Sequence, residues 1–388
     1  MTGRNSMKIL IIRNFPSYMA VKNNTYNIQE VGLAKALVRK GNTCDIVFWT
    51  DKEEEIVEIP VDEVGTVHVF YRHGKTFLKN TVFQNCEELY SQYDVLQPCE
   101  YNQIQAWMIA KRYPEKVIIY HGPYYSKFNK RYNLMCKVFD ILFLPRYINL
   151  GTPFLVKSNL AKEFLVNKGI KECNVHTVGV GIDTQMLTNA ELVCNDTIYK
   201  KMAQDSSSTK ILYVGRIEER RNIKFLLDVF QKVHQKDTNA KLYMIGTGEK
   251  GYLDSCFSYM KEIGIADYVV WQEKMEQKFL SRIYQLSDFF LLPTEYEIFG
   301  MVLLEAMYYR NVVLTTVNGG SSTLMKNGEN GFVFAEKNAS VWANCILDLD
   351  KNKMKSIQDN AHQTIAAKYT WDALADRFIE NYQAKINH

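Results

Sequence analysis

Short apolar runs alternate with helical segments along most of the 388 residues, and this alternation limits the fold to a few classes. Lys8 to Ile12 is typical of a buried parallel strand, Ile28 to Arg39 has apolar residues at helical spacing, and Cys44 to Trp49 is a second strand-like run. A second series of this kind begins at Lys210 to Val214. The pattern predicts an α/β protein with Rossmann-like, doubly wound parallel sheets.

Length and composition are those of an ordinary globular protein. The chain is long enough for two domains, each with its own core, and 47% of it is hydrophobic. A formal net charge of +4 is too small to indicate a nucleic-acid partner. Eight cysteines without a C-x-x-C pair, no visible signal peptide and no membrane-length apolar run lead us to expect a cytoplasmic protein, at most peripheral on a membrane.

One stretch, residues 289–307, carries the strongest functional signal. Its apolar run ends at Pro293, Glu297 lies just before a predicted helix start, and Glu305 lies one to two turns inside that helix. The unpaired backbone donors of the helix start are the amides of Gly300, Met301 and Val302. Such donors bind anions, and flanking carboxylates can hold hydroxyl groups on either side of a phosphate, as in a sugar nucleotide. Spacing alone favours the alternative, an ordinary acidic first turn with a solvated glutamate.

The same stretch resembles the E-x7-E signature of the retaining glycosyltransferases of family 4. The resemblance rests on Glu297-Ile-Phe-Gly-Met-Val-Leu-Leu-Glu305, with Pro293-Thr294 before it and Ala306-Met307 after it. It covers nearly the whole chain and is strongest from Gly179 to Phe334. It implies the GT-B fold, in which two Rossmann-like doubly wound domains face each other across a cleft.

The resemblance also implies the domain limits. We expect an acceptor-binding domain at residues 1–185 and a donor-binding domain at residues 186–369. A final amphipathic helix, within residues 370–388, is expected to cross back onto the first domain.

Three charged positions acquire roles from the resemblance. His121 ends a predicted buried strand and is expected to contact the donor sugar, although position alone favours a hydrogen-bonded turn histidine. Arg216 and Arg221 follow the strand at 210–214 and are expected to stabilise the diphosphate, because arginine binds phosphate bidentately. The family usually has lysine where Arg221 stands. Solvated surface arginines are the alternative.

The remaining roles concern the donor. Glu297 is expected to hold the sugar hydroxyls and Glu305 the ribose. The other expected donor-binding residues are Gly215, Gly246, Gly248, Phe299, Gly300, Met301 and Val302. Fixed cations can replace a metal at such a site, so no metal or other cofactor is expected.

Two rival functions remain open. Gly246-Thr-Gly-Glu-Lys-Gly251 matches the G-x-G-x-x-G dinucleotide fingerprint, and Glu273 follows about twenty residues later, which suits an NAD-dependent enzyme. A non-catalytic partner subunit of the same fold is the second rival. Departures from the family pattern leave it open: Asn23-Asn24 stands in place of a Gly-Gly pair, and Thr323 stands in place of a glutamate.

Residues 127–146 are basic and aromatic, with Asp140 as the only acidic residue. The segment can rest on an anionic membrane, and a core helix with a basic outer face is the alternative. Asp51 to Asp62 is expected to be an exposed connector, and Asn189 to Ser208 shows no clear periodicity. Asp348-Leu-Asp350 resembles a D-x-D metal pair but is interpreted as surface.

Taken with the resemblance, these patterns predict a cytoplasmic retaining glycosyltransferase that uses a nucleoside-diphosphate sugar, with UDP as the favoured nucleotide. The expected acceptor is a glycan or a lipid-linked acceptor such as a glycolipid, and bacterial surface polysaccharide or glycoconjugate synthesis is expected by analogy with the family.

Overall fold

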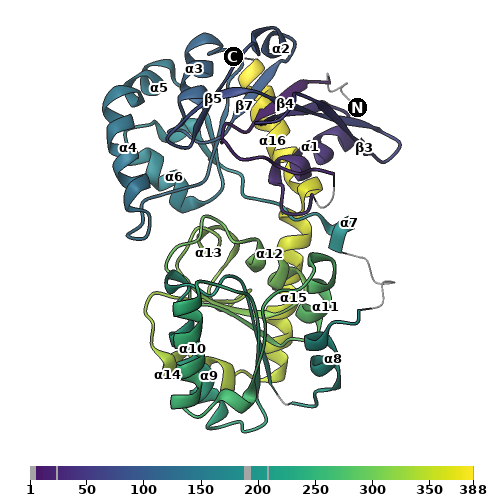
Figure 1. Ribbon diagram of the computed structural model, residues 1–388, viewed down its shortest axis with the longest axis vertical. Coiled ribbons are helices and arrows are strands. Elements are labelled where there is room, and N and C mark those ends of the chain that lie inside the picture. The colour runs from purple at the N-terminus through teal and green to yellow at the C-terminus, as the bar shows by residue number, and fades with distance from the viewer. Residues whose placement is uncertain (1–5, 23–24, 188–193, 208, 388) are drawn as a thin grey trace. The chain divides into compact units, whose positions relative to one another are not determined.

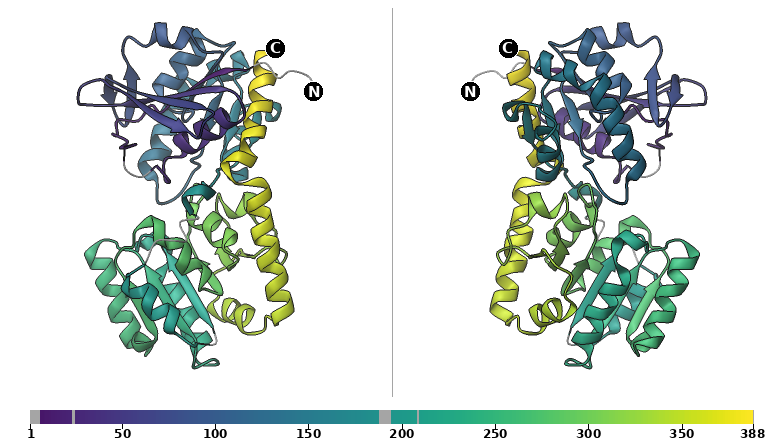
Figure 2. Two further views of the ribbon diagram at one scale, coloured as in Figure 1. Left: turned by 90° about the vertical axis from the view of Figure 1, so that its right-hand side faces the viewer. Right: turned by 90° about the vertical axis from the view of Figure 1, so that its left-hand side faces the viewer.

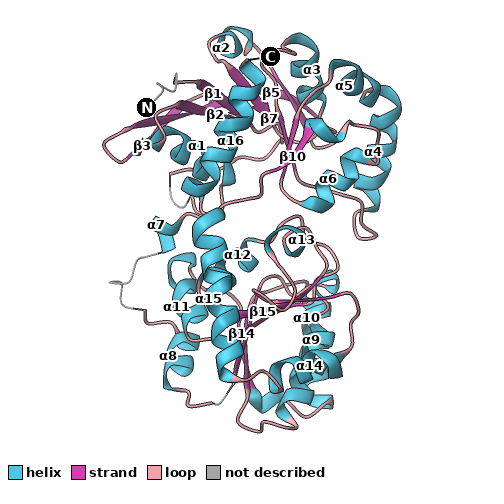
Figure 3. Ribbon diagram, turned by 180° about the vertical axis from the view of Figure 1, so that it is seen from behind, coloured by secondary structure: helices cyan, strands magenta, loops and turns pink. Residues whose placement is uncertain are grey.

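A computed structural model describes residues 6–22, 25–187, 194–207 and 209–387 (Figure 1). The chain forms two compact units: unit 1 comprises Met1–Asp183 and Thr370–His388, and unit 2 comprises Thr184–Tyr369. The division falls two residues before the limit expected at residue 185. In each unit, strands form a central sheet with helices around it (Figure 3).

Unit 1 contains a five-stranded sheet of order β3-β4-β2-β1-β7 and a three-stranded sheet of order β10-β9-β8. Its strands are β1 (Lys8–Ile12), β2 (Thr43–Trp49), β3 (Ile56–Val61), β4 (Gly65–Arg72), β7 (Val95–Pro98), β8 (Ile119–His121), β9 (Phe154–Val156) and β10 (Val175–Thr177). A separate hairpin pairs β5 (Gly74–Phe77) with β6 (Asn80–Phe83). The two larger sheets are joined where the Leu96 N–H donates to the Lys116 carbonyl at 3.0 Å and the Ile118 N–H donates to the Leu96 carbonyl at 3.0 Å.

The helices of unit 1 include one from the far end of the sequence. They are α1 (Gln29–Arg39), α2 (Glu87–Ser91), α3 (Ile104–Arg112), α4 (Lys130–Leu142), α5 (Leu144–Leu150), α6 (Asn159–Val166) and α16 (Trp371–Ile386). Helix α16 packs beside α1, as the labels in Figure 1 show. The Thr370 hydroxyl caps α16 by accepting from the Ala373 N–H at 3.1 Å.

The return of α16 depends on two glycines. Trp371, 3% exposed, lies directly against Gly32 of α1 and against Gly181. A Cβ atom on Gly32 would lie 2.2 Å from Trp371 Nε1, and one on Gly181 would lie 2.7 Å from Trp371 Cδ2. Glycine in a helix interior costs stability, so its presence in α1 is explained by the space that the indole occupies.

Unit 2 contains a six-stranded parallel sheet of order β13-β12-β11-β14-β15-β16. Its strands are β11 (Lys210–Val214), β12 (Lys241–Ile245), β13 (Val269–Gln272), β14 (Phe289–Leu292), β15 (Val312–Thr316) and β16 (Phe332–Phe334). The order reverses between β11 and β14, which is the Rossmann arrangement. Strands β11, β12, β14 and β15 are almost entirely buried, as expected for strands with helices on both faces.

The helices of unit 2 follow its strands along the chain. They are α7 (Thr184–Leu187), α8 (Thr197–Gln204), α9 (Ile223–His234), α10 (Lys250–Glu262), α11 (Gln277–Gln285), α12 (Met301–Tyr308), α13 (Ser321–Leu324), α14 (Ala339–Leu347) and α15 (Lys351–Lys368). The long helix α15, yellow-green in Figure 2, packs against α12. Asp350 caps α15 by accepting from the Asn352 and Lys353 N–H groups at 2.9 Å each. The second aspartate of the D-x-D pattern therefore has a structural role as a helix cap.

Two segments differ from the predictions. Asp51 to Asp62 is not simply a connector, because it contains the edge strand β3, whose side chains alternate between exposed and partly buried. Pro60 fits there because an edge strand needs only one set of ladder hydrogen bonds. Within the stretch from Asn189 to Ser208, helix α8 forms after the N-cap Asp196, whose side chain accepts from the Ile198 N–H at 3.2 Å. Residues 188–193 and 208, and the Asn23-Asn24 pair, lie outside the described residues.

The contact between α16 and α1 gives a direct prediction. Gly32→Ala places a Cβ atom within the indole of Trp371, so we expect it to destabilise the protein by about 1–3 kcal/mol, the usual cost of overpacking. Thermal and urea unfolding measure this loss. Gly251→Ala is the matched control, because that helical glycine has no atom within 4 Å of an added Cβ among the described residues. Equal effects of the two substitutions would contradict the packing argument.

Candidate nucleotide-sugar site

The predicted donor residues of unit 2 lie where the strand order reverses. The loop after β11 contains Gly215, Arg216 and Arg221, and the loop after β14 contains Glu297 and leads into α12. In open parallel sheets, ligands bind outside the carboxyl ends of the strands at this reversal. The two loops are tied together: the Glu295 N–H donates to the Arg220 carbonyl at 2.9 Å, and Asn222 Nδ2 donates to the Pro293 carbonyl at 2.8 Å.

Gly246 and Gly248 are explained by contact between neighbouring loops. A Cβ atom on Gly246 would lie 1.7 Å from the Gly215 carbonyl oxygen, and one on Gly248 would lie 1.7 Å from the Ile217 carbonyl oxygen. The Ile217 N–H donates to the Thr247 carbonyl at 2.9 Å across the same contact. These glycines therefore allow two backbones to touch, which accounts for the G-x-G pattern without a dinucleotide. The third glycine, Gly251, makes no such close approach.

Gly319 and Gly320, in the loop after β15, pack against residues 297–299, which precede α12. A Cβ atom on Gly319 would lie 2.0 Å from the Ile298 carbonyl oxygen, and one on Gly320 would lie 1.8 Å from the Phe299 carbonyl oxygen. The Gly319 N–H donates to the Glu297 carbonyl at 2.9 Å. The two glycines therefore allow close backbone contact with the loop that carries Glu297.

The centre of the site is a buried ion pair. Arg221 is 9% exposed, and its Nη1 lies 2.6 Å from Glu297 Oε2. Arg221 Nε has no hydrogen-bond acceptor among the described residues. A buried guanidinium with an unused donor retains the capacity to bind a second anion.

Arg220 is a site residue that the sequence patterns did not indicate. Its Nη1 donates to the Tyr296 carbonyl at 2.6 Å and lies 3.7 Å from Glu297 Oε2, while its Nη2 lies 2.6 Å from Glu218 Oε1. The Arg-Arg doublet in the sequence is the signal that could have indicated it. Arg220 thus supports the backbone and the carboxylate against which Arg221 rests.

Arg216 has a different environment from Arg221. Its side chain is 66% exposed, and its Nε lies 3.5 Å from Glu218 Oε2. The Tyr213 hydroxyl donates to the Arg216 carbonyl at 2.6 Å and so fixes the backbone, and burial raises the pKa of that phenol. The structure therefore anchors the backbone of Arg216 at the reversal and leaves its guanidinium facing solvent.

Helix α12 begins with open backbone donors. Gly300, at φ 85°, precedes the helix, and no side chain of the described residues caps it. Met301 and Val302 form its first turn, and Phe299 in the preceding loop is 2% exposed. The start of α12 has the backbone geometry of an anion site and lies next in the chain to the Glu297 loop.

Glu305 lies inside α12 and is 2% exposed. The Tyr284 hydroxyl donates to Glu305 Oε2 at 2.8 Å, and Gln277 Nε2 donates to Glu305 Oε1 at 3.1 Å. Both donors come from α11, which the sequence analysis gave no role. These two donors orient the carboxylate inside the helix.

His121 belongs to unit 1, where it ends β8 and is 0% exposed. Its Nδ1 lies 2.6 Å from Glu100 Oε2, and its ring stacks on Phe164 at 5.5 Å between centroids. Although burial opposes ionisation of Glu100, His121, Lys157 and the Gly122 N–H hold the pKa of that carboxyl below its ordinary value. The predicted contact between His121 and a donor sugar stays a prediction.

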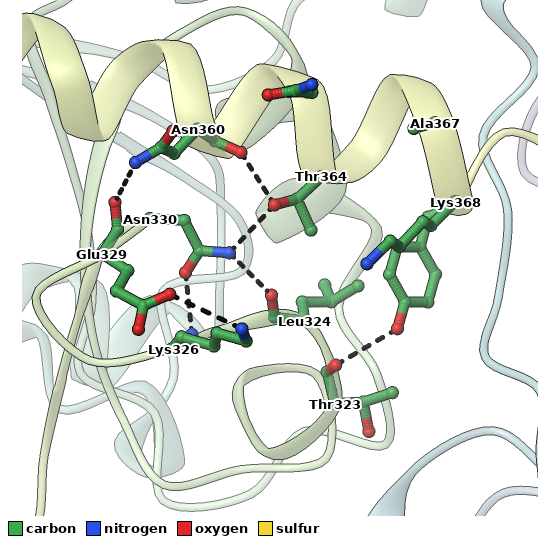
Figure 4. A pocket seen from close by; sticks show the side chains of 11 residues that line it. Thr323, Leu324, Lys326, Glu329, Asn330, Asn360, Thr364, Ala367 and Lys368 are labelled. Atoms are coloured by element: carbon green, nitrogen blue, oxygen red, sulfur yellow. Dashed lines mark hydrogen bonds and ion pairs between the residues drawn. The ribbon is translucent and has the colours of Figure 1, made fainter.

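A pocket of about 380 Å³ lies between residues 323–330 and the C-terminal half of α15 (Figure 4). At its base, the Asn330 amide accepts from the Lys326 N–H at 2.7 Å and donates to the Leu324 carbonyl at 3.0 Å and to Thr364 Oγ1 at 3.1 Å. These bonds hold the loop that follows α13 against α15. The polar groups around Asn330 therefore have a structural role in joining this loop to α15.

Among the residues that the structure describes, no set of three or more His, Cys, Asp and Glu side chains is placed to hold a metal ion. The eight cysteines are all free thiols, six of them buried. The requirement for a metal is therefore tested by experiment below.

The second half of the chain is similar to proteins of a known family. Residues 195–371, most of unit 2, match the family described as glycosyl transferases group 1. The lipopolysaccharide 1,2-N-acetylglucosaminetransferase of Salmonella typhimurium is 29% identical over 208 residues, which cover 48% of this chain and 53% of that protein. The chain spans about half the length of the curated relatives it matches.

Two solved structures resemble the whole chain. A glycosyltransferase from Rickettsia africae has a TM-score of 0.73 and 18% identity, with 99% of this chain and 100% of that chain covered. Anabaena HepE, solved with UDP and glucose, has a TM-score of 0.67 and 15% identity, with 97% and 100% covered. The predicted GT-B fold is confirmed, and residues 195–371 of unit 2 are similar to the group 1 glycosyl transferases.

The support of Glu305 by α11 gives a prediction about stability. Tyr284→Phe removes a buried hydrogen bond to a carboxylate, so we expect a loss of about 1.5–3 kcal/mol in the free energy of unfolding. Tyr259→Phe is the matched control, because the Tyr259 hydroxyl donates to Asp228 Oδ1 at 2.6 Å in a part-exposed position. We expect the control to lose less than about 1 kcal/mol. Equal losses in urea unfolding would show that Glu305 does not depend on Tyr284.

Proposed function

We propose that this protein is a retaining glycosyltransferase that moves a sugar from a nucleoside-diphosphate sugar to a glycan or lipid-linked acceptor. The observation that carries the proposal is the buried Arg221–Glu297 pair at the strand reversal, with Arg221 Nε lacking an acceptor among the described residues and the open start of α12 close by in sequence. This arrangement suits a diphosphate that joins a sugar to a nucleoside.

The departing diphosphate needs positive charge. Arg221 supplies it from a buried position, and Arg216 supplies it from an exposed position on the same loop. The amides of Met301 and Val302 would donate to the phosphate oxygens. Such preorganised donors usually give the largest contribution to catalysis, and they act without a metal in this proposal.

The two glutamates would bind hydroxyl groups at opposite ends of the donor. Glu297 would hold the sugar hydroxyls, and its contact with Arg221 orients its carboxylate. Glu305 would accept from the ribose hydroxyls, since Tyr284 and Gln277 already fix its orientation. His121 of unit 1 would contact the transferred sugar. Retention would follow attack from the side of the leaving group.

UDP is the proposed nucleotide, and a surface glycan is the proposed destination. HepE of Anabaena was solved with UDP and glucose, and the Salmonella relative is named for transfer to lipopolysaccharide. Both facts concern those proteins and support the proposal by likeness. The NAD-dependent rival is weakened because Gly246 and Gly248 have a packing role and Gly251 has none.

Ligand binding tests the nucleotide. We expect UDP, and one UDP-sugar above others, to raise the melting temperature, because a ligand that binds only the folded state stabilises it by about 2.7 kcal/mol at a hundredfold excess over Kd. The panel includes GDP, ADP and NAD, and each ligand is measured with and without EDTA. A shift with NAD alone would move the function to the Gly246–Gly251 loop. A UDP shift that EDTA abolishes would contradict the metal-free site.

Substitution of the arginines tests the chemistry. We expect Arg221→Ala and Arg216→Ala each to lower turnover of the UDP-sugar about 100-fold or more, which is the usual cost of removing one preorganised donor. Arg221→Lys keeps the charge and should retain more activity. Arg310→Ala is the control, because Arg310 is a half-exposed arginine of unit 2 paired with Asp359. Near-normal turnover in folded Arg221→Ala would remove that residue from the mechanism. If the wild type turns over none of the donors, the result would favour the rival function, a non-catalytic partner subunit.

A further inference from the structure

Helix α4 of unit 1 presents large aliphatic side chains to solvent. The exposed fractions are 65% for Leu134, 52% for Val138, 79% for Ile141 and 64% for Leu142. Monomeric surfaces normally scatter such residues singly, and a contiguous set marks an interaction site. The helix lies at the periphery of unit 1 beside α5 and α6 (Figure 1).

The four aliphatic residues form one stripe. At the helical rotation of about 100° per residue, they fall within an arc of about 100°. The opposite side of α4 holds its buried residues, Cys136 and Phe139, which are 0% and 6% exposed. The helix therefore already has an apolar face in the core of unit 1, and the stripe is a second apolar face. The alternative interpretation of α4, a core helix with a basic outer face, accounts for the buried residues Cys136 and Phe139. It does not account for the aliphatic residues on the outer face.

Cationic side chains accompany the stripe. Lys130 and Lys137 lie along one edge of it, and Arg131 lies within its arc near the start of the helix; all three are exposed. Residues 127–146 contain five cations and one carboxylate, a net charge of +4 that equals that of the whole chain. That carboxylate, Asp140, forms an ion pair with Lys168, whose side chain is 7% exposed. The outer face of α4 is therefore basic and aliphatic.

We propose that the outer face of α4 binds the surface of an anionic lipid bilayer. A helix with aliphatic residues on one face and cations beside them suits the boundary between headgroups and acyl chains, where it lies in the plane of the membrane. A second copy of this chain fits less well, because a symmetric contact would place two sets of cations against each other. None of the helices in the described ranges is both long and apolar enough to cross a membrane, so the contact is peripheral.

Flotation of the full chain with lipid vesicles tests the proposal. We expect binding to phosphatidylcholine vesicles that contain phosphatidylglycerol, little binding without it, and weaker binding at high salt. Leu134→Ser/Ile141→Ser removes the most exposed aliphatic residues and should lower the partition coefficient about tenfold or more. Lys130→Gln/Arg131→Gln/Lys137→Gln should lower it about 100-fold, because each cation near an anionic surface contributes about a factor of five.

Matched controls change the same chemistry elsewhere. Ile56→Ser/Val341→Ser replaces two aliphatic residues that are 54% and 49% exposed, and Lys351→Gln/Lys353→Gln/Lys355→Gln removes three exposed cations from α15. Both controls should float like the wild type. The proposal is overturned if the wild type does not float with anionic vesicles, or if the α4 variants float as it does. It is also overturned if sedimentation shows a dimer that Ile141→Ser dissociates.

The ligand panel separates this proposal from the proposed function. The α4 variants should keep the same melting-temperature shift with UDP as the wild type, because α4 belongs to unit 1 and the nucleotide contacts are proposed in unit 2. Flotation without a UDP shift would support the membrane surface and refute the donor site. A UDP shift without flotation would do the opposite.

Discussion

The candidate site depends on a buried guanidinium that is only partly satisfied. Arg221 Nη1 lies 2.6 Å from Glu297 Oε2, and Arg221 Nε finds no hydrogen-bond acceptor in the described part of the chain. Removing a cation from water is costly unless it is paired, so under the proposed function an anion would satisfy the open donor of this buried group. Arg220 stabilises the same arrangement. Its guanidinium contacts the Tyr296 carbonyl and Glu218, and so it holds the Glu297 loop against the loop after β11.

Backbone contact between loops makes this geometry rigid. Gly246 and Gly248 bring the loop after β12 onto the loop after β11, and Gly319 and Gly320 bring the 318–320 turn onto residues 297–299. Any side chain at these glycines would meet a carbonyl oxygen. The strand order places all of these loops at the carboxyl edge of one sheet, and the start of α12 adds backbone donors at the same edge. The fold thus supplies orientation, and a few charges supply the chemistry.

The sequence predicts those features of the fold that depend on residues close together in the chain or on the family resemblance. Strands, the helix start at Gly300, the loop glycines and the return of a C-terminal helix all follow from periodicity, from turn chemistry or from the family resemblance. Long-range partners did not follow: Tyr284 and Gln277 reach Glu305 from another helix, and Trp371 requires Gly32 across more than 300 residues. The exposure of Leu134 and its neighbours also could not be predicted. A helix with apolar residues on two faces has the same sequence whether other elements cover both faces or only one.

A crystal structure of the protein with UDP tests the central claim most directly. The proposed site requires the diphosphate to lie within hydrogen-bond distance of the Arg221 guanidinium and of the Met301 and Val302 amides. It also requires the ribose hydroxyls to lie on Glu305. Density for UDP in that position would establish the site. Density for UDP elsewhere, or against the Gly246–Gly251 loop with Arg221 still turned to Glu297 alone, would contradict it.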